Sequence, residues 1–302
     1  MHIGIFGGDT AGRTIDDIVA DARQAEADGF SSFALPQIFG LDAMAVLTIV
    51  GREVPRIELA TGVVPTYSRH PLTMAQQALT VAAASDGRFV LGIGLSHQFV
   101  IEHMFGLSFE KPVRHMREYL TVLQSLNKTN NVSFSGDVYS THAGVSVAGS
   151  QPFGVVVAAL GEQMLRVTAA LADGTLTWCT GPSTLAGHTV PVLNRAADEL
   201  GKPKPRVIAA LPVCVTTKVA EARERASQVF AIYGQLPSYR AMLDKEGAAG
   251  PADIAIVGTA AEVTDRIAAL ADVGVTDFAA VEFGGDADES ANTRAALKTL
   301  LS

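Results

Sequence analysis

Short apolar runs alternate with amphipathic stretches along almost the whole 302-residue chain, and this alternation limits the fold more than any other feature. The apolar runs expected to form strands are 3–6, 30–35, 57–64, 89–93, 154–159, 175–179, 207–215 and 277–283. A stretch with helical spacing follows each of them, including a helix over 183–200 and a long Ala-rich helical region from Val219. Such strand–helix–strand units pair their strands in parallel with right-handed crossovers. Eight units predict a closed (β/α)8 barrel of the TIM type, and an open doubly wound sheet is the alternative.

The ends of the expected helices carry ordinary start and stop signals. Thr14, for example, can cap the first helix through its hydroxyl group, and Gly29 can end it. The regular alternation stops between residues 95 and 150, where a long connection, a helix and a hairpin over 132–147 indicate an insertion after the fourth strand. Because no low-complexity linker divides the chain, we expect a single domain over 1–302.

Composition argues against several classes of protein. The 23 basic and 31 acidic side chains give a formal charge of −8 without basic clusters, which is unfavourable for binding nucleic acid or an anionic membrane. The two cysteines, Cys179 and Cys214, lie in apolar runs and are typical of a reducing compartment. The first residues do not form a signal peptide, and no apolar stretch is long enough to span a membrane. We therefore expect a cytoplasmic protein.

In a parallel barrel the reactive groups follow the carboxyl ends of the strands. Here these segments contain glycines, hydroxyl groups and a few histidines, and they lack clustered carboxylates and paired metal-binding histidines. A metal site is therefore not expected. The expected strands contain no lysine that could form a Schiff base. This set of residues favours a site in which a bound cofactor supplies the chemistry.

Several segments resemble the luciferase-like monooxygenase family, and within it the branch of oxidoreductases that use the deazaflavin coenzyme F420. The most specific segment is D-G-R-F-V-L-G-I-G at 86–94; the others, in the same order along the chain, are 25–30, 59–67, 158–161 and 271–275. The resemblance implies a barrel that binds F420 or FMN at the carboxyl ends of its strands and that often forms a homodimer. It also implies hydride transfer to or from a small molecule, or flavin-dependent monooxygenation.

The resemblance further implies roles for individual residues. A cis peptide bond between Gly62 and Val63 would form a bulge behind the cofactor ring. The residues expected to bind the cofactor are Gln37, Thr61, Gly62, Val63, Gly94, Ser96, His97, Ala159, Leu160, Gly161, Glu162 and Gln163. His97 and Tyr67 are the candidate catalytic residues, since an imidazole or a phenol can supply a proton or a hydrogen bond. Trp178 is a candidate for a wall of the site.

The phosphate end of the cofactor is expected at Leu160, Gly161 and the start of the next helix, where free amides and the helix dipole attract anions. The sequence departs from its relatives here, because Leu160 replaces one of two common glycines. Glu162 would also repel a phosphate if its side chain pointed inward. The pair Gly284-Gly285, after the last strand, is a competing anion site.

The leading hypothesis is an F420-dependent oxidoreductase that transfers a hydride between the deazaflavin C5 and an organic substrate. A reduced-FMN-dependent monooxygenase of the same fold is the alternative, because the two ring systems have nearly the same shape. Pro36 and Gln37 stand where many relatives carry an acid and a histidine, so a catalytically reduced cofactor-binding protein is a third hypothesis. A phosphosugar isomerase or lyase would need Asp9, Glu282 or Asp286 as a base.

Overall fold

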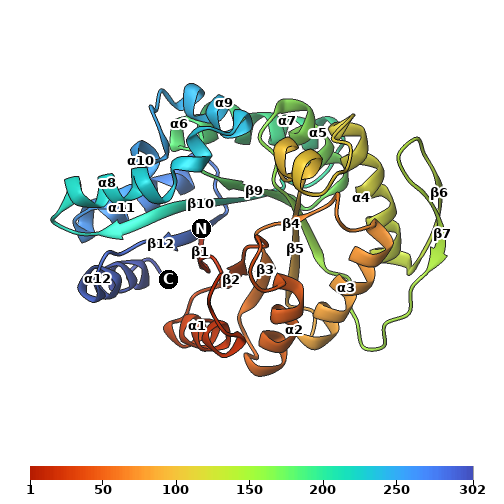
Figure 1. The fold of residues 1–302 in the computed structure, drawn as a ribbon, viewed down its shortest axis with the longest axis horizontal. Helices are drawn as coiled ribbons and strands as arrows, with labels where there is room; N and C mark the ends of the chain where they lie inside the picture. The colour runs from red at the N-terminus through yellow and green to blue at the C-terminus, as the bar shows by residue number, and fades with distance from the viewer. Residues whose placement is uncertain (302) are drawn as a thin grey trace.

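The computed structural model describes residues 1–301, and within them eight parallel strands form a closed ring with helices around it (Figure 1). The ring consists of β1 (His2–Phe6), β2 (Ser32–Leu35), β3 (Glu58–Thr61), β5 (Phe89–Gly94), β8 (Gly154–Val157), β9 (Gly174–Trp178), β10 (Arg206–Val215) and β12 (Asp277–Glu282). Each strand pairs with the ring strand before and after it, and β1 pairs with β12. The predicted (β/α)8 barrel is thus confirmed, and the open sheet is wrong.

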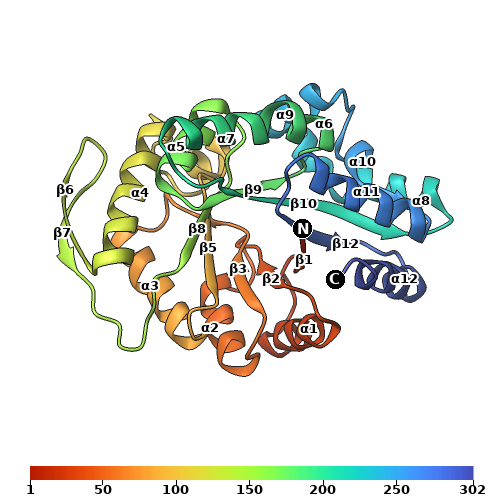
Figure 2. The ribbon, with the colours of Figure 1, turned by 180° about the vertical axis from the view of Figure 1, so that it is seen from behind.

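The long helices lie outside the ring, which Figure 2 shows from behind. They are α1 (Ile15–Asp28), α2 (Ala43–Glu53), α3 (Pro71–Ala84), α4 (Pro112–Thr129), α5 (Glu162–Leu171), α7 (Val190–Glu199), α8 (Val219–Val229), α11 (Ala260–Asp272) and α12 (Ala287–Lys298). Their ends follow the signals in the sequence. Thr14 and Asp17 form a capping box at the start of α1, and Gly29 ends this helix with a φ of 93°.

The strand pattern departs from the prediction most clearly at two places. The third predicted strand is interrupted, because β3 ends at Thr61 and β4 (Val64–Pro65) resumes after the bulge and pairs with β5. A short strand that was not predicted, β11 (Ile256–Gly258), pairs with the carboxyl end of β10. Its three residues are too few for a periodicity to be recognised.

Two predicted helices are also divided. The region after Val219 consists of α8, η3 (Ala231–Gly234), α9 (Pro237–Glu246) and α10 (Pro251–Ile254). The predicted helix over 183–200 begins as α6 (Pro182–Thr184) and a π-helical turn, η2 (Leu185–Thr189), before α7. The breaks in the first region coincide with Gly234, Pro237, Gly247 and Pro251, which disfavour a continuous helix.

The irregular stretch after β5 consists of two pieces separated by a barrel helix. Helix α4 packs between α3 and α5, so it belongs to the ring of helices. A loop over 95–111, which contains the π-helical turn η1 (Val100–Met104), precedes α4. A hairpin of β6 (Asn131–Ser135) and β7 (Ser140–Gly144) follows it and lies at the edge of the molecule in both ribbon views.

The hairpin turn is fastened to α4 by one buried carboxylate. Glu118 accepts hydrogen bonds from the backbone N–H groups of Asp137, Val138 and Tyr139 at 3.1, 2.8 and 2.9 Å. Glu118 is 8% exposed, so water could hardly replace its carboxylate as the acceptor for these three N–H groups.

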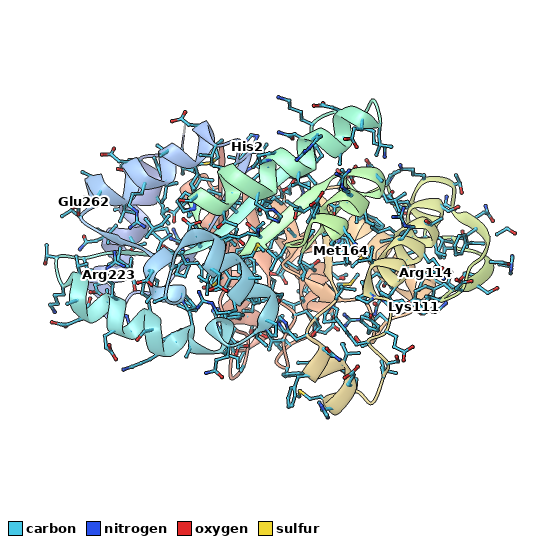
Figure 3. All side chains as sticks on the ribbon, turned by 90° about the horizontal axis from the view of Figure 1, so that it is seen from above. His2, Lys111, Arg114, Met164, Arg223 and Glu262 are labelled. Carbon is cyan, nitrogen blue, oxygen red and sulfur yellow. The ribbon has the colours of Figure 1, made fainter. Side chains whose placement is uncertain are left out.

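The interior of the barrel is apolar, and its two ends differ. Small and medium side chains fill it: Ala34, Ala60, Val90, Val156, Leu176, Ile208, Ala210 and Ala279. At the end where the strands begin, Arg206 lies between the carboxylates of Glu58, at 2.9 Å, and Asp277, at 2.7 Å. Figure 3 shows His2 on this side, and a turn of the 95–111 loop projects on the opposite side. The carboxyl ends of the strands, which we call the mouth, therefore lie on the side of this loop.

Candidate functional site

The bulge in the third strand forms part of the floor of the mouth. The peptide bond between Gly62 and Val63 is cis, as the family resemblance implies. A Cβ atom on Gly62 would lie 2.4 Å from Cε2 of Phe6, so this ring leaves room for glycine alone. Cβ atoms on Gly92 and Gly94 would lie 3.1 and 2.8 Å from the methyl groups of Val63. The glycines therefore let Val63 pack closely over the end of β5.

Thr61 supports the bulge from below. Its side chain is fully buried, its Oγ1 accepts a hydrogen bond from the N–H of Gly92 at 2.9 Å, and it donates to the Gly92 carbonyl at 2.8 Å. This hydroxyl group has one proton to donate, and the neighbouring strand accepts it. The structure thus places Thr61 behind the bulge, where its side chain contributes to the site through the backbone that it holds.

A row of aromatic side chains crosses the mouth. The ring centroids of Phe6 and Trp178 are 6.4 Å apart, those of Trp178 and Tyr233 5.5 Å, and those of Tyr233 and Tyr239 5.3 Å. His97 ends the row, 5.6 Å from Tyr239. The Nε1 atom of Trp178 is buried and forms no hydrogen bond of standard geometry within residues 1–301, and the hydroxyl group of Tyr233 lies near it. An indole N–H in this state is a donor for which a ligand could supply the acceptor.

The sequence did not indicate Tyr233 and Tyr239 as residues of the mouth. They lie on η3 and α9, in a region predicted as one long helix, and the chain break between these elements brings both rings to the ends of the strands. Phe6 was also missed, although its position as the last residue of the first strand was a usable signal.

His97 follows β5 and is partly buried. Burial lowers its pKa below the usual value, so the imidazole is neutral at pH 7. Ser96, immediately before it, has a φ of 60°, which turns the chain from the strand into the loop over 95–111. The mouth therefore contains a neutral imidazole that can accept a proton or donate a hydrogen bond through one nitrogen.

Tyr67 lies in a second aromatic cluster, which also contains residues of α4 and of the loop before it. Its ring stacks on His115 at a centroid distance of 3.8 Å and on Phe109 at 5.2 Å. Its hydroxyl oxygen is buried and has no hydrogen-bond partner in the described part of the chain. Burial, together with the negative charge of Glu102, raises the pKa of Tyr67 to about 12. The phenol is therefore fully protonated at neutral pH.

Gln37 is partly used by the fold. Its Oε1 accepts a hydrogen bond from the N–H of Ala43 at 2.8 Å, at the start of α2. The side-chain oxygen is thus engaged, and the NH2 group is the end that could reach a ligand. A glutamine can hold α2 in this way and still donate toward the mouth.

The carboxylates considered as catalytic bases are engaged by neighbouring groups. Asp9 accepts a hydrogen bond from the N–H of Ala11 at 3.1 Å, and Asp286 accepts one from the N–H of Glu289 at 2.8 Å. Glu282 forms an ion pair with Arg294. These contacts give each carboxylate a structural role and provide no support for a phosphosugar isomerase or lyase.

The backbone amides in the first turn of α5 are not capped by any side chain in the part of the chain that the structure describes. Gly161 is the N-cap residue, it is exposed, and a Cβ atom on it would meet nothing within 4 Å. The Glu162 carboxylate lies along the helix against Arg166 at 3.1 Å, which offsets the repulsion expected from this residue. Ala159 is buried, Gln163 is exposed, and the Leu160 carbonyl accepts a hydrogen bond from Nε2 of His188 at 2.8 Å.

Two other places where backbone N–H groups could bind an anion, at Gly285 and at the start of α6, are occupied by carboxylates of the chain itself. The N–H of Gly285 donates to Glu289 at 2.7 Å, and Arg225 pairs with the same carboxylate at 2.6 Å. At the start of α6, the N–H groups of Ser183 and Thr184 donate to Glu246 at 3.1 and 2.7 Å. Among these three positions, the start of α5 is the one at which a phosphate would meet uncapped amides.

The remaining polar groups of the chain do not form a metal centre within residues 1–301, where no three His, Cys, Asp or Glu side chains are suitably grouped. Over the same range, no helix is long and apolar enough to cross a membrane. Cys179 and Cys214 are buried free thiols, and burial raises the pKa of both. The mouth therefore offers aromatic rings, a neutral histidine, hydroxyl groups and backbone amides.

A barrel with this bulge, an aromatic mouth and an uncapped helix after its fifth ring strand defines an enzyme of the flavin- and deazaflavin-dependent class. The chain belongs to the luciferase-like monooxygenase family, whose model matches residues 1–277.

Known relatives and solved structures are similar over most of the chain. A putative coenzyme F420-dependent oxidoreductase of Mycobacterium tuberculosis is 26% identical over 278 residues, which cover 87% of this chain and 78% of that protein. The structure of the F420-dependent tetrahydromethanopterin reductase of Methanopyrus kandleri superposes with a TM-score of 0.81 at 20% identity, covering 100% and 98% of the two chains. The oxygenating constituent of 3,6-diketocamphane monooxygenase of Pseudomonas putida, in complex with FMN, gives 0.77 at 17% identity, covering 100% and 97%. At these identities the two structures establish the fold.

Proposed function

We propose that the protein is an F420-dependent oxidoreductase that transfers a hydride between C5 of the deazaflavin and a small organic molecule. The observation that carries this proposal is the position of the uncapped amides at the start of α5. This helix follows β8, and β8 pairs with β5, the strand that also pairs with β4 after the bulge. A coenzyme with a flat ring and an anionic tail would meet the bulge and these amides together. The similarity to a relative named for F420 supports this coenzyme over FMN.

The residues of the mouth fit such a coenzyme. The ring would lie against Gly62 and Val63, and the buried N–H of Trp178 and the NH2 group of Gln37 would be donors for its carbonyl oxygens. Gly94, Ser96, His97 and Ala159 would line the same edge, and the phosphate would meet Leu160, Gly161, Glu162 and Gln163. When bound, the deazaflavin supplies a carbon centre that accepts or donates a hydride.

We further propose that the protein acts as a homodimer in a reducing compartment such as the cytoplasm. The family resemblance supports the dimer, and two buried free cysteines support the compartment. A formal charge of −8 supports a small-molecule substrate over nucleic acid. Light scattering measures the oligomeric state directly.

Coenzyme affinity tests the proposal. We expect oxidised F420 to bind at least tenfold more tightly than FMN, as measured by quenching of coenzyme fluorescence. Tighter binding of FMN would refute the F420 assignment and favour the reduced-FMN-dependent monooxygenase. Binding of F420 without turnover of any enone, imine or quinone would instead favour a cofactor-binding protein that has lost catalysis.

The pH dependence of the reaction tests the role of His97. Its pKa is lowered by burial and lies below about 6.5. The neutral form can accept the proton that leaves an alcohol, so oxidation should lose rate as the pH falls through this pKa. In the reverse direction the imidazolium is the acid, so reduction should lose rate as the pH rises through the same pKa. Both pH-dependent losses of rate should be absent in His97→Asn. A loss that persists in this variant would exclude His97 as the acid–base group.

A further inference from the structure

The hydroxyl group of Tyr67 is a buried donor whose partner is not supplied by the described residues. The adjacent Thr66 donates its backbone N–H to the carbonyl of Gly94 at 2.9 Å. This bond joins the Tyr67 loop to the end of β5, from which the chain continues to His97. The loop that carries Tyr67 is therefore fixed beside the mouth, and a ligand bound there is the natural source of the missing acceptor.

His115 is a buried ionisable residue that the proposed chemistry does not yet use. It is 3% exposed, and contacts fix its imidazole on both nitrogens. Nε2 lies 2.9 Å from Oγ1 of Thr66, and Nδ1 lies 3.5 Å from the hydroxyl oxygen of Tyr139. The face of the imidazole is nearly parallel to the ring of Tyr67, with an interplanar angle of 11°. A ring held in this way restricts the orientation of Tyr67.

The charges around this pair make Tyr67 a donor and favour a neutral ligand. Burial lowers the pKa of His115 to about 4 against a smaller opposing effect of Glu118, so the imidazole is uncharged at neutral pH. The carboxylate of Glu102 is close enough to raise the pKa of Tyr67, and it would repel an anionic ligand. Tyr139 is also protonated, because burial and the neighbouring Tyr67 and Glu118 raise its pKa. A neutral carbonyl compound meets these conditions better than a carboxylate does.

We infer that Tyr67 donates a hydrogen bond to the carbonyl oxygen of the substrate, and that His115 is the positioning residue that orients Tyr67 for this contact. The inference rests on the proposed function. Negative charge develops on the carbonyl oxygen when a carbonyl compound or a quinone accepts a hydride, and a donor already in place stabilises that charge. Tyr67 keeps its proton in this step, and the oxygen receives its own proton from His97 or water.

The test uses the full-length protein, anaerobic reduced F420 and menadione as the carbonyl probe, with single-turnover rates measured by stopped flow. We expect Tyr67→Phe to lower the rate constant about 100- to 1,000-fold, as removal of a single oxyanion donor does, and to leave the dissociation constant of F420 within twofold. His115→Phe keeps a stacked ring but loses both contacts of its nitrogens, so it should show most of the same loss. The double variant should be no slower than Tyr67→Phe, because both substitutions act on the same hydrogen bond between Tyr67 and the substrate.

Tyr119→Phe is the matched control. Tyr119 lies in the same aromatic cluster, and its hydroxyl group donates to the carbonyl of Arg69 at 3.0 Å, away from Tyr67. This variant should be less stable and should react with menadione at the wild-type rate. Menadione binding, measured by quenching of the single tryptophan, Trp178, gives a second readout, and Tyr67→Phe should weaken it at least fivefold.

The outcomes separate this inference from the proposed function. Failure of the wild-type protein to bind F420 would overturn the proposed function, and this inference with it. Normal F420 binding with an unchanged Tyr67→Phe variant, or with no binding of menadione, would overturn the inference and leave the coenzyme assignment intact. Additive losses in the double variant would show that His115 acts independently of Tyr67 and would refute its positioning role.

Discussion

A Gly161→Asp substitution is expected to stabilise the protein and, at the same time, to weaken F420 binding at least 100-fold. Gly161 has a φ of −77° and a ψ of 150°, which an aspartate adopts without strain, and a Cβ atom there meets no neighbour. The new carboxylate would cap the first turn of α5 and add about 0.5–1 kcal/mol of stability. It would also occupy the amides that we assign to the coenzyme phosphate and repel that phosphate, and 100-fold corresponds to about 2.8 kcal/mol.

Gly161→Asn is the matched control for charge, because it offers a similar cap without a negative charge. It should raise the melting temperature less than the aspartate does, because it lacks the charge that interacts with the helix dipole, and it should weaken coenzyme binding far less. Calorimetry for stability and fluorescence titration for affinity measure the two effects separately. An aspartate variant that binds F420 as tightly as the wild type would show that the phosphate lies elsewhere.

A Glu118→Gln substitution is expected to destabilise the protein by about 3 kcal/mol. The carboxylate accepts three backbone hydrogen bonds from the hairpin turn, and an amide would present an NH2 group to at least one of these N–H donors. Hydrogen bonds to a charged acceptor contribute about 1.5–3 kcal/mol each, and a buried N–H left without a partner is costly. Urea denaturation measures the loss of stability.

Hydrogen exchange locates this effect in the molecule. The amides of Asp137, Val138 and Tyr139 should exchange faster in Glu118→Gln, while those of the barrel strands change little. Glu110→Gln, an exposed substitution in the preceding loop, should leave stability and exchange unchanged. If Glu118→Gln has the stability of the wild type, the hairpin turn is held by contacts other than this carboxylate.

The barrel was predictable because each strand is a short apolar segment whose ends are marked by neighbouring residues in the sequence. The ranges predicted for the first, fourth and last strands agree with β1, β5 and β12 within one residue at each end. Parallel strands that are covered by helices carry continuous apolar runs, and this pattern is local in the sequence. The shape of the irregular part was less predictable, because α4 lies inside the predicted insertion and yet packs as a barrel helix.

The candidate site was predictable to the extent that it follows from strand ends and from the resemblance. The Gly62–Val63 bond is cis as the resemblance implies, whereas the assignments of His97, Tyr67 and the cofactor-binding residues stay predictions. Pairings between distant residues were not readable from the sequence. The carboxylate of Glu289 accepts a hydrogen bond from the N–H of Gly285, and this contact explains why one of the two expected anion sites is closed to a ligand.

The sequence by itself determined the order of strands and helices, because hydrophobic periodicity and capping residues act over a few positions and need no distant partner. The tertiary structure decided which polar groups are satisfied. Tyr67 and His115 are 48 positions apart, yet their ring centroids are 3.8 Å apart, and the hydroxyl group of Tyr67 has no hydrogen-bond partner among residues 1–301. Burial and electrostatics depend on everything that packs around a group, so these properties appear once the chain has closed into its barrel.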